Sequence, residues 1–303
     1  MATAGKVCKL IGARGLLAAA GLVSMTSAAN ADVAYGVTQQ QRLIRFDTAT
    51  PGTIDLGVAI SGLASNESIQ GIDFRPNQGL LYGLGSQNNL YTINITSGAA
   101  TFVSALSIPL NGASFGFDFN PTGPVGLRIV SNTDKNYRIG NPAMGGVVTQ
   151  DTDLAYIAGD SGFGVNPNIT HVAYTNSFPG ATSTTLYGID AGRDVLVRFA
   201  SPNAGTLQTV GTLGMGTDAN INVNGGFDIS AISGIGYASV QNASLSESTL
   251  WTIDLATGAG ASLGSIGGGE TLVAFALAGG NIPAPSAGLL AALGALAVSR
   301  RRR

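Results

Sequence analysis

The chain has 303 residues, of which 45% are hydrophobic and only 11% are charged, and its formal net charge is −2. One histidine and one cysteine are too few for a histidine-based zinc site or an internal disulfide. The segment 32–281 holds eight of the fifteen basic residues and all seventeen acidic residues, a formal charge of −9, which argues against nucleic acid or an anionic membrane surface as a partner.

The first 31 residues have the pattern of a secretory signal peptide. Three basic side chains precede an apolar run over residues 15–25, and small residues follow at the spacing that signal peptidase requires. We therefore expect signal peptidase to cut between Ala31 and Asp32. The only cysteine, Cys8, precedes the apolar run and would be removed with the leader, so no thiol chemistry is expected in the mature protein.

A short motif of alternating apolar residues, usually after glycine, recurs along the segment 32–281. Its copies are GIDFRP at Gly71, GFDFNP at Gly116, GFGVNP at Gly162, GFDIS at Gly226 and LVAFAL at Leu272. A repeat of about 45 residues made of short strands is typical of β-propellers, in which each repeat is one blade. Each copy of the motif is therefore predicted to be the first strand of a blade.

Further strand-like segments follow each of the first four copies, separated by turn residues. The predicted second strands are LLYGLGS from Leu80, GLRIVSN from Gly126, HVAYTNS from His171 and GYASV from Gly236. The predicted third strands are NLYTINI from Asn89, NYRIGN from Asn136, TTLYGID from Thr184 and TLWTIDL from Thr249. Weaker fourth strands are ATFVSAL from Ala100, TLQTVGTL from Thr206 and ASLGSI from Ala261.

The two ends of the segment are incomplete in complementary ways. VAYGVT, RLIRFD and TIDLGVAI near the start match second to fourth strands, and LVAFAL at the end is a first strand alone. Joining them closes a ring and removes exposed strand edges. We predict an all-β fold, a five-bladed β-propeller over 32–281, with helices only in the signal peptide and the C-terminal tail. Extra sequence around 190–200, including DVLVRFAS, leaves a hairpin insertion and a sixth blade as alternatives.

Several of these segments together resemble a known family. LLYGLGSQNNLYTINITSG, GLRIVSNTDKNYRIGNP, DTDLAYIAGD, NPNITHVAYTNSFPGATSTTLYGID, DVLVRFASPNAGTLQTVGTLG and LWTIDLATGA are similar to the bacterial domain-of-unknown-function family numbered 4394. The resemblance extends from Tyr35 to Ala276. It implies a secreted, β-propeller-like domain, sometimes with a PEP-CTERM tail, that has no assigned activity and no catalytic residues to carry over.

Asp73, Asp118 and Asp228 occupy equivalent positions in three of the five motif copies, on the strands expected nearest the axis. A ring of carboxylates there offers the oxygen ligands that calcium prefers. Alternatively, each aspartate accepts hydrogen bonds from the backbone of a neighbouring blade. Gly164 and Ala274 interrupt the ring and favour the second interpretation.

A second acidic cluster lies in DTDLAYIAGD. Asp151 and Asp153 fall on one side of an extended segment, and Asp160 could return to meet them at a calcium ion. The EF-hand spacing is absent, so a solvated loop is the competing interpretation.

His171 would have to serve any serine triad, but no GxSxG elbow accompanies it and we expect it at the surface or at a sheet edge. The recurring aromatic residues Tyr82, Tyr91, Tyr187 and Trp251 are expected to pack between strands. If one face binds polysaccharide, the first residues to test are Tyr137, Tyr156 and Phe178, near loops.

The C-terminal segment 282–303 has the pattern of a sorting signal. Pro283-Ala284-Pro285-Ser286 precedes an apolar run over 287–298, and four arginines end the chain. The run is too short to span a hydrocarbon core of roughly 30 Å comfortably. The segment resembles the PEP-CTERM signal, which implies a C-terminal sorting peptidase as a partner, although Ala284 stands where that family has glutamate. An unprocessed short anchor is the alternative.

Two functions fit these observations. The first is an exported, non-catalytic β-propeller at the cell surface or in the extracellular matrix, transiently anchored by its tail, that binds a polysaccharide or a protein through loops on one face. The second is a propeller enzyme, lactonase-like or glycan-cleaving, that uses an axial carboxylate and calcium site. No other cofactor is expected.

Overall fold

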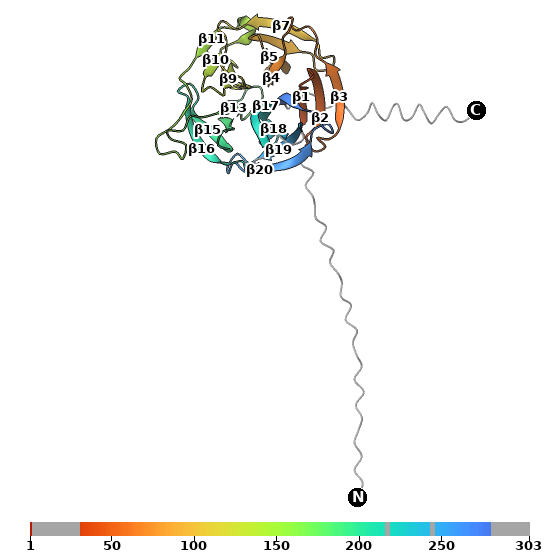
Figure 1. Ribbon diagram of the computed structural model, residues 1–303, viewed down its shortest axis with the longest axis vertical. Coiled ribbons are helices and arrows are strands. Elements are labelled where there is room, and N and C mark those ends of the chain that lie inside the picture. Colours follow the sequence, from red (N-terminus) through yellow and green to blue (C-terminus); the bar gives the residue numbers. More distant parts are fainter. Residues whose placement is uncertain (2–30, 216–218, 243–245, 280–303) are drawn as a thin grey trace, which may run out of the picture.

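The computed structural model describes Met1 and residues 31–215, 219–242 and 246–279. These residues form five sheets, arranged as blades around a central axis (Figure 1). The predicted all-β, five-bladed β-propeller is confirmed, and five rather than six is the number of blades.

Each blade runs from an inner strand at the axis to an outer edge. Blade A contains β21 (Leu272–Leu277), β1 (Val33–Thr38), β2 (Arg42–Asp47) and β3 (Ile54–Ala59). Blade B contains β4 (Ile69–Arg75), β5 (Leu80–Gly85), β6 (Asn89–Ile93) and β7 (Ala100–Ala105). Blade C contains β8 (Phe115–Phe119), β9 (Leu127–Ser131), β10 (Asn136–Ile139) and β11 (Val148–Gln150).

The last two blades complete the ring. Blade D contains β13 (Ile169–Tyr174), β14 (Leu186–Asp190), β15 (Val195–Ser201), β16 (Thr206–Thr212) and, at its outer edge, β12 (Ala155–Tyr156). Blade E contains β17 (Ala219–Ile229), β18 (Gly236–Asn242), β19 (Glu247–Ile253) and β20 (Gly260–Ser265). The inner strands β4, β8, β13, β17 and β21 contact one another around the axis.

A non-glycine residue with a positive φ comes shortly before the third strand of every blade; these residues are Gln41, Asn88, Asp134, Asp194 and Ser246. Asn and Asp tolerate this left-handed conformation better than most residues, because their short polar side chains can hydrogen-bond to the nearby backbone. This left-handed residue therefore recurs with the blade even where the sequence around it differs.

Apolar side chains fill the spaces between neighbouring blades. Tyr35 of blade A meets Phe74 of blade B with ring centroids 5.3 Å apart, and Tyr82 of blade B meets Phe119 of blade C at 5.1 Å. All four are buried. Burying a large apolar side chain stabilises a fold by about 1.5–3 kcal/mol, so each blade depends on both of its neighbours.

Blade A closes the ring as the sequence predicts. Strand β21, from the end of the described chain, pairs antiparallel with β1, in register from Ala34 with Leu277 to Thr38 with Leu272. The segments 33–59 and 272–277 thus form one sheet (Figure 1).

The prediction for blade D was wrong by one strand. GFGVNP, expected as the inner strand, lies among turns, and the inner strand is β13, which was expected as the second. DVLVRFAS is β15, an ordinary third strand rather than an insertion. The extra sequence lies before β13, where β12 pairs in parallel with β16 and covers the outer edge of the blade.

Helical structure in the described residues is limited to one 3-10 turn, Pro142–Met144, a small departure from the expectation of no helix in the propeller. No helix within the described ranges is long and apolar enough to cross a membrane. The expected helices of the leader and the tail, and the processing residues Pro283 to Ser286, lie outside the described residues.

Candidate axial site

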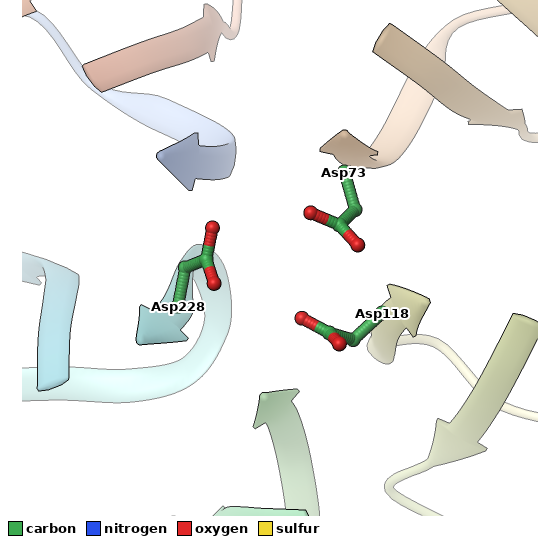
Figure 2. A group of neighbouring side chains, drawn as sticks. All are labelled: Asp73, Asp118 and Asp228. Atoms are coloured by element: carbon green, nitrogen blue, oxygen red, sulfur yellow. The ribbon is translucent and has the colours of Figure 1, made fainter. Parts of the chain in front are cut away.

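Three acidic side chains meet at the axis of the ring. Asp73 on β4, Asp118 on β8 and Asp228 on β17 point toward one another (Figure 2). Each offers one carboxylate oxygen, and these oxygens lie within 4.8 Å of one another. All three residues are at least 96% buried. The first sequence-predicted cluster is therefore brought together.

The same carboxylates hold the inner strands to one another. Asp73 Oδ2 accepts a hydrogen bond from Phe119 N (2.8 Å), Asp118 Oδ1 from Tyr174 N (3.1 Å) and Asp228 Oδ2 from Leu277 N (2.6 Å), each in the next blade. The interpretation that these residues bridge blades through the backbone is confirmed.

Two blades have alanine, not aspartate, at this position, and the residues that interrupt the ring are Ala173 and Ala276 rather than the expected Gly164 and Ala274. Ala173 and Ala276 precede Tyr174 and Leu277, so the next blades, E and B, receive no carboxylate from their neighbours. In those blades the corresponding backbone N–H groups donate to their own aspartates: Ile229 N to Asp228 Oδ1 and Phe74 N to Asp73 Oδ1, both at 2.6 Å. Three aspartates thus satisfy one inner-strand amide in each of five blades, as buried backbone donors require.

Burial makes the charged form of these carboxyl groups unfavourable. It raises the pKa of Asp73 and of Asp118 well above the usual range, and the charges of the other axial carboxyls raise both further. Burial also raises the pKa of Asp228 to about 7, despite the two backbone N–H groups that favour its charged form. The group therefore retains protons at pH values where exposed aspartates have lost them.

The donor chemistry of this group fits a hard cation only in part. Carboxylate oxygens are suitable calcium ligands, but calcium takes six to eight of them and three aspartates provide at most half with one oxygen each. Most of these oxygens already accept backbone hydrogen bonds. Calcium at this site stays a prediction.

A pocket opens at the end of the axis where the inner strands begin. It has a volume of about 230 Å³, and it is lined by Gln39, Gln41, Ser68, Ile69, Gln70, Ala113, Ser114, Phe115, His171, Asn224, Gly225 and Val273. A narrow cavity of about 20 Å³ between all five inner strands shares His171 with it. We call the larger one the axial pocket.

His171 was expected at the surface or at a sheet edge; the surface placement is wrong, whereas the edge placement is right, because β13 is the inner edge strand of blade D. It lies on β13, an inner strand, and is only 4% exposed. Burial lowers the pKa of its imidazole to about 4, so the ring is neutral at pH 7. Its Nε2 is buried and has no hydrogen-bond partner among the described residues. No nucleophile is therefore hydrogen-bonded to that nitrogen, as a serine triad would require.

The rest of the axial pocket combines polar and apolar side chains and is uncharged. Its lining contains glutamine, asparagine and serine side chains and no Asp, Glu, Lys or Arg. Gln41 fixes part of the rim, because its side chain accepts a hydrogen bond from Ile69 N (2.6 Å) and donates one to Ile69 O (3.3 Å) across the boundary between blades A and B. The sequence analysis missed these residues. Among these polar residues only Gln70 directly precedes the glycine of a motif copy, so the repeat gives little signal for the rest.

The second acidic cluster serves the structure of blades C and D. Asp151 pairs with Arg128 (2.8 Å) and Arg138 (2.9 Å), and Asp153 pairs with Lys135 (2.5 Å). Within the described ranges, the only set of three or more acidic, His or Cys side chains at ligating separation is the axial one.

Asp160 instead binds the edge of blade D. Its carboxylate accepts hydrogen bonds from Thr209 N and the Thr209 hydroxyl, both at 2.7 Å, and from Gly162 N at 2.8 Å. These bonds attach the segment after β12 to β16.

The aromatic candidates fall into two groups. Tyr82 and Tyr91 are buried as expected, and Tyr187 and Trp251 pack against the core of blades D and E. Tyr137 and Tyr156, however, are also buried and present no ring to a polysaccharide, so only Phe178, 41% exposed, remains available for stacking.

Just before the first strand, Ala31 is exposed and Asp32 is buried. Asp32 N donates to Thr48 Oγ1 (3.0 Å), and its carboxylate accepts from the Ser230 hydroxyl (2.9 Å) in blade E. Cleavage between Ala31 and Asp32 stays a prediction.

The model of the family described as "Domain of unknown function (DUF4394)" matches residues 42–276. No curated protein matches the chain. Similar solved structures include one of a nidogen/laminin complex, at 13% identity and a TM-score of 0.45, where the match covers 82% of this chain and 98% of the other.

Two further similar structures come from Bacteroides thetaiotaomicron VPI-5482. A protein of unknown function has 16% identity and a TM-score of 0.47, with 77% of this chain and 58% of that one covered. An auxiliary nutrient binding protein has 14% identity and a TM-score of 0.42, with 78% of this chain and 50% of that one covered.

Proposed function

The chain belongs to the domain-of-unknown-function family DUF4394, and from the geometry at its axis we propose that it is a non-catalytic β-propeller that binds a neutral, hydroxyl-rich ligand in the axial pocket. The ligand is a unit of an extracellular polysaccharide. The signal-peptide pattern of residues 1–31 and the sorting pattern of 282–303 support export to the cell surface or the matrix.

The observation that carries this proposal is His171, which lines the axial pocket and whose Nε2 has no partner in the part of the chain that the structure describes. A buried polar atom without a partner destabilises a fold by about 1–3 kcal/mol, so natural proteins rarely retain one without a use for it. Neutral imidazole can donate or accept one hydrogen bond at this atom, and a sugar hydroxyl can do either in return.

The class of ligand follows from the charge of the pocket. With His171 neutral, the lining has no charged group. A charged ligand would lose its hydration there without gaining an opposite charge. A neutral polyol instead exchanges water for the amide and hydroxyl groups of the lining.

The test is to titrate the full-length protein with cellotriose, maltotriose and chitotriose and to measure binding by isothermal titration calorimetry. We expect at least one of them to bind, and His171→Phe to weaken that binding at least tenfold. Phe178→Ala is the control, because Phe178 is exposed and outside the pocket lining. The proposal fails if no trisaccharide binds, or if Phe178→Ala removes binding and His171→Phe does not.

One observation favours the second function, an enzyme that uses axial calcium. Asp73, Asp118 and Asp228 present oxygens within 4.8 Å of one another, in reach of one cation. Melting temperatures in calcium and in chelator, for the wild type and Asp118→Asn, separate the two functions. A rise in calcium that disappears in Asp118→Asn would favour the enzyme, and equal melting temperatures would favour the binding protein.

A further inference from the structure

A second pocket lies at the opposite ends of the inner strands, at the boundary between blades C and D. It has a volume of about 210 Å³, and it is lined by Asn120, Thr122, Pro124, Gly126, Leu127, Arg128, Arg138, Ile139, Gly140, Tyr174 and Asn203. We call it the arginine pocket. Asn120 and Tyr174 come at the ends of β8 and β13, whereas the axial pocket uses the beginnings of these strands. The two sites are therefore separate.

Two arginines face each other across neighbouring strands of this pocket. Arg128 on β9 and Arg138 on β10 are directly opposed in the antiparallel register. Like charges at such positions destabilise a sheet unless an opposite charge lies between them. Asp151 supplies it by accepting hydrogen bonds from Arg128 Nη1 (2.8 Å) and Arg138 Nε (2.9 Å).

This arrangement leaves one positive charge in excess. Two guanidinium groups share one carboxylate, and no further salt bridge to either arginine exists among the described residues. Asp118 lies opposite Arg128 in the register of β8 and β9, but no salt bridge joins the two among the described residues. Burial raises the pKa of Asp118 well above its usual range, which makes it a weaker counter-charge than an exposed aspartate.

The two arginines have different tasks. Arg128 is 4% exposed and donates to Asn136 Oδ1 (2.7 Å) and Asn203 Oδ1 (2.6 Å) as well as to Asp151, which fixes it in the wall. The Arg138 side chain is 48% exposed and reaches Asp151 through Nε alone within the part of the chain described. Its two terminal nitrogens remain for a ligand.

We propose that the arginine pocket binds the carboxylate of a sugar acid, such as a hexuronate unit of an acidic polysaccharide. The parallel donors of a guanidinium group match the two oxygens of a carboxylate. Asn120, Thr122 and Asn203 lie around them and offer hydrogen bonds to ring hydroxyls. The volume is below the roughly 300–1,000 Å³ of sites for drug-sized ligands and suits one sugar unit.

The charge balance favours carboxylate over phosphate. One excess positive charge neutralises one carboxylate, whereas a phosphate near pH 7 brings between one and two negative charges. The segment 32–281 already has a formal charge of −9, so a second uncompensated negative charge is repelled. This inference does not depend on the axial pocket.

The test is a calorimetric titration of the full-length protein at pH 6 with glucuronate, glucose, inorganic phosphate and sulfate. We expect glucuronate to bind and the other three to bind at least tenfold more weakly. Arg138→Gln should weaken glucuronate binding at least tenfold. The matched control is Arg198→Gln, because Arg198 is an exposed arginine on β15 that is hydrogen-bonded to Gln208 and lies outside the pocket lining.

A second variant, expected to strengthen binding rather than weaken it, makes the test sharper. Asp151→Asn removes the carboxylate that the two arginines share, raises the excess charge to two and should strengthen glucuronate binding. A melting curve of each variant shows whether it is folded. The proposal is overturned if glucose binds as tightly as glucuronate, if phosphate or sulfate binds as tightly, or if Arg138→Gln and Arg198→Gln have equal effects.

Discussion

His171 is a residue where stability and the proposed binding role oppose each other. Its buried Nε2 has no partner within the described ranges, so replacing the ring with an apolar one should not destabilise the protein. We predict that His171→Phe raises the free energy of unfolding by about 1 kcal/mol at pH 7, which is about 2–4 °C in melting temperature for a domain of this size.

The pH dependence of this gain has a definite sign. The pKa of His171 is about 4 in the folded protein, below its usual value of 6.5. The unfolded chain therefore binds a proton first, and wild-type stability is lost as the pH falls from 6.5 to 4. His171→Phe lacks this loss, so its advantage should be larger at pH 5 than at pH 7. A melting temperature lower than that of the wild type at both pH values would contradict the free Nε2.

Two substitutions of Asp118 separate the effect of losing a hydrogen bond from the effect of losing a charge. Asp118→Ala leaves the buried N–H of Tyr174 without an acceptor, and we predict that it lowers the free energy of unfolding by about 1–3 kcal/mol. Asp118→Asn retains an oxygen at the same place and should change it by less than about 1 kcal/mol. Chemical denaturation of both variants is the measurement. Equal destabilisation would mean that the carboxylate charge, rather than the hydrogen bond, holds blades C and D together.

Inner strands approach one another closely because glycine precedes each axial aspartate by two residues. A Cβ atom on Gly116 would lie 2.8 Å from Val172 N and 3.0 Å from His171 C, which are backbone atoms of the next blade. Gly116→Ala must therefore move β8 away from β13. We predict that it lowers the free energy of unfolding by about 1–3 kcal/mol, as overpacked cores do.

Gly140→Ala is the matched control for this prediction. A Cβ atom there has no neighbour within 4 Å, and its φ is not in the left-handed region. Melting temperatures of both variants decide the matter. If Gly116→Ala is as stable as Gly140→Ala, the inner strands have room to separate.

Blade repeats are predictable where the motif and the inner strand coincide. GIDFRP, GFDFNP, GFDIS and LVAFAL overlap the inner strands β4, β8, β17 and β21, and the pairing of the two chain ends follows from what each end lacks. The prediction fails for blade D because GFGVNP has the local pattern of the motif but lies among turns. Its true inner strand begins with Ile169-Thr170-His171, where histidine replaces the glycine of the motif.

The axial aspartates were predictable as a group, because equivalent positions in a ring converge on its axis. Their shared task was not, because Ala173 and Ala276 interrupt the ring and only the structure shows Asp73 and Asp228 each binding two amides. Arg128 and Arg138 were also missed, since a cross-strand pair becomes visible only when the register is known.

The molecule as a whole closes before the proposed sorting segment begins. Strand β21 ends at Leu277, and the last backbone bond of the closing sheet runs from Ala278 N to Val33 O (2.8 Å). Deletion of residues 282–303 should therefore leave the melting temperature unchanged while it changes where the protein is found in cell fractions. A melting temperature lower by several degrees would mean that the tail contributes to the fold.

The overall pH dependence of stability should follow the axial aspartates. The pKa values of Asp73, Asp118 and Asp228 are raised by burial, and the charges that raise them further come from one another and from Asp32. Each lies above the value of 3.8 expected in the unfolded chain, so the folded state holds more protons between about pH 4 and pH 7. Stability then falls as the pH rises through this window, by about 1.4 kcal/mol per pH unit for each retained proton.

His171 makes stability rise with pH, because its pKa is lowered in the folded protein. It accounts for only one proton, so the three carboxyl groups should dominate the pH dependence of stability. We predict a higher melting temperature at pH 5 than at pH 7.5 in buffers of equal ionic strength. Asp118→Asn removes one titrating carboxyl group and should reduce this difference, whereas Asp55→Asn, at an exposed surface pair with Arg45, should leave it unchanged. A melting temperature that rises with pH would require the axial carboxylates to be charged in the folded protein, and hence an opposite charge beside them.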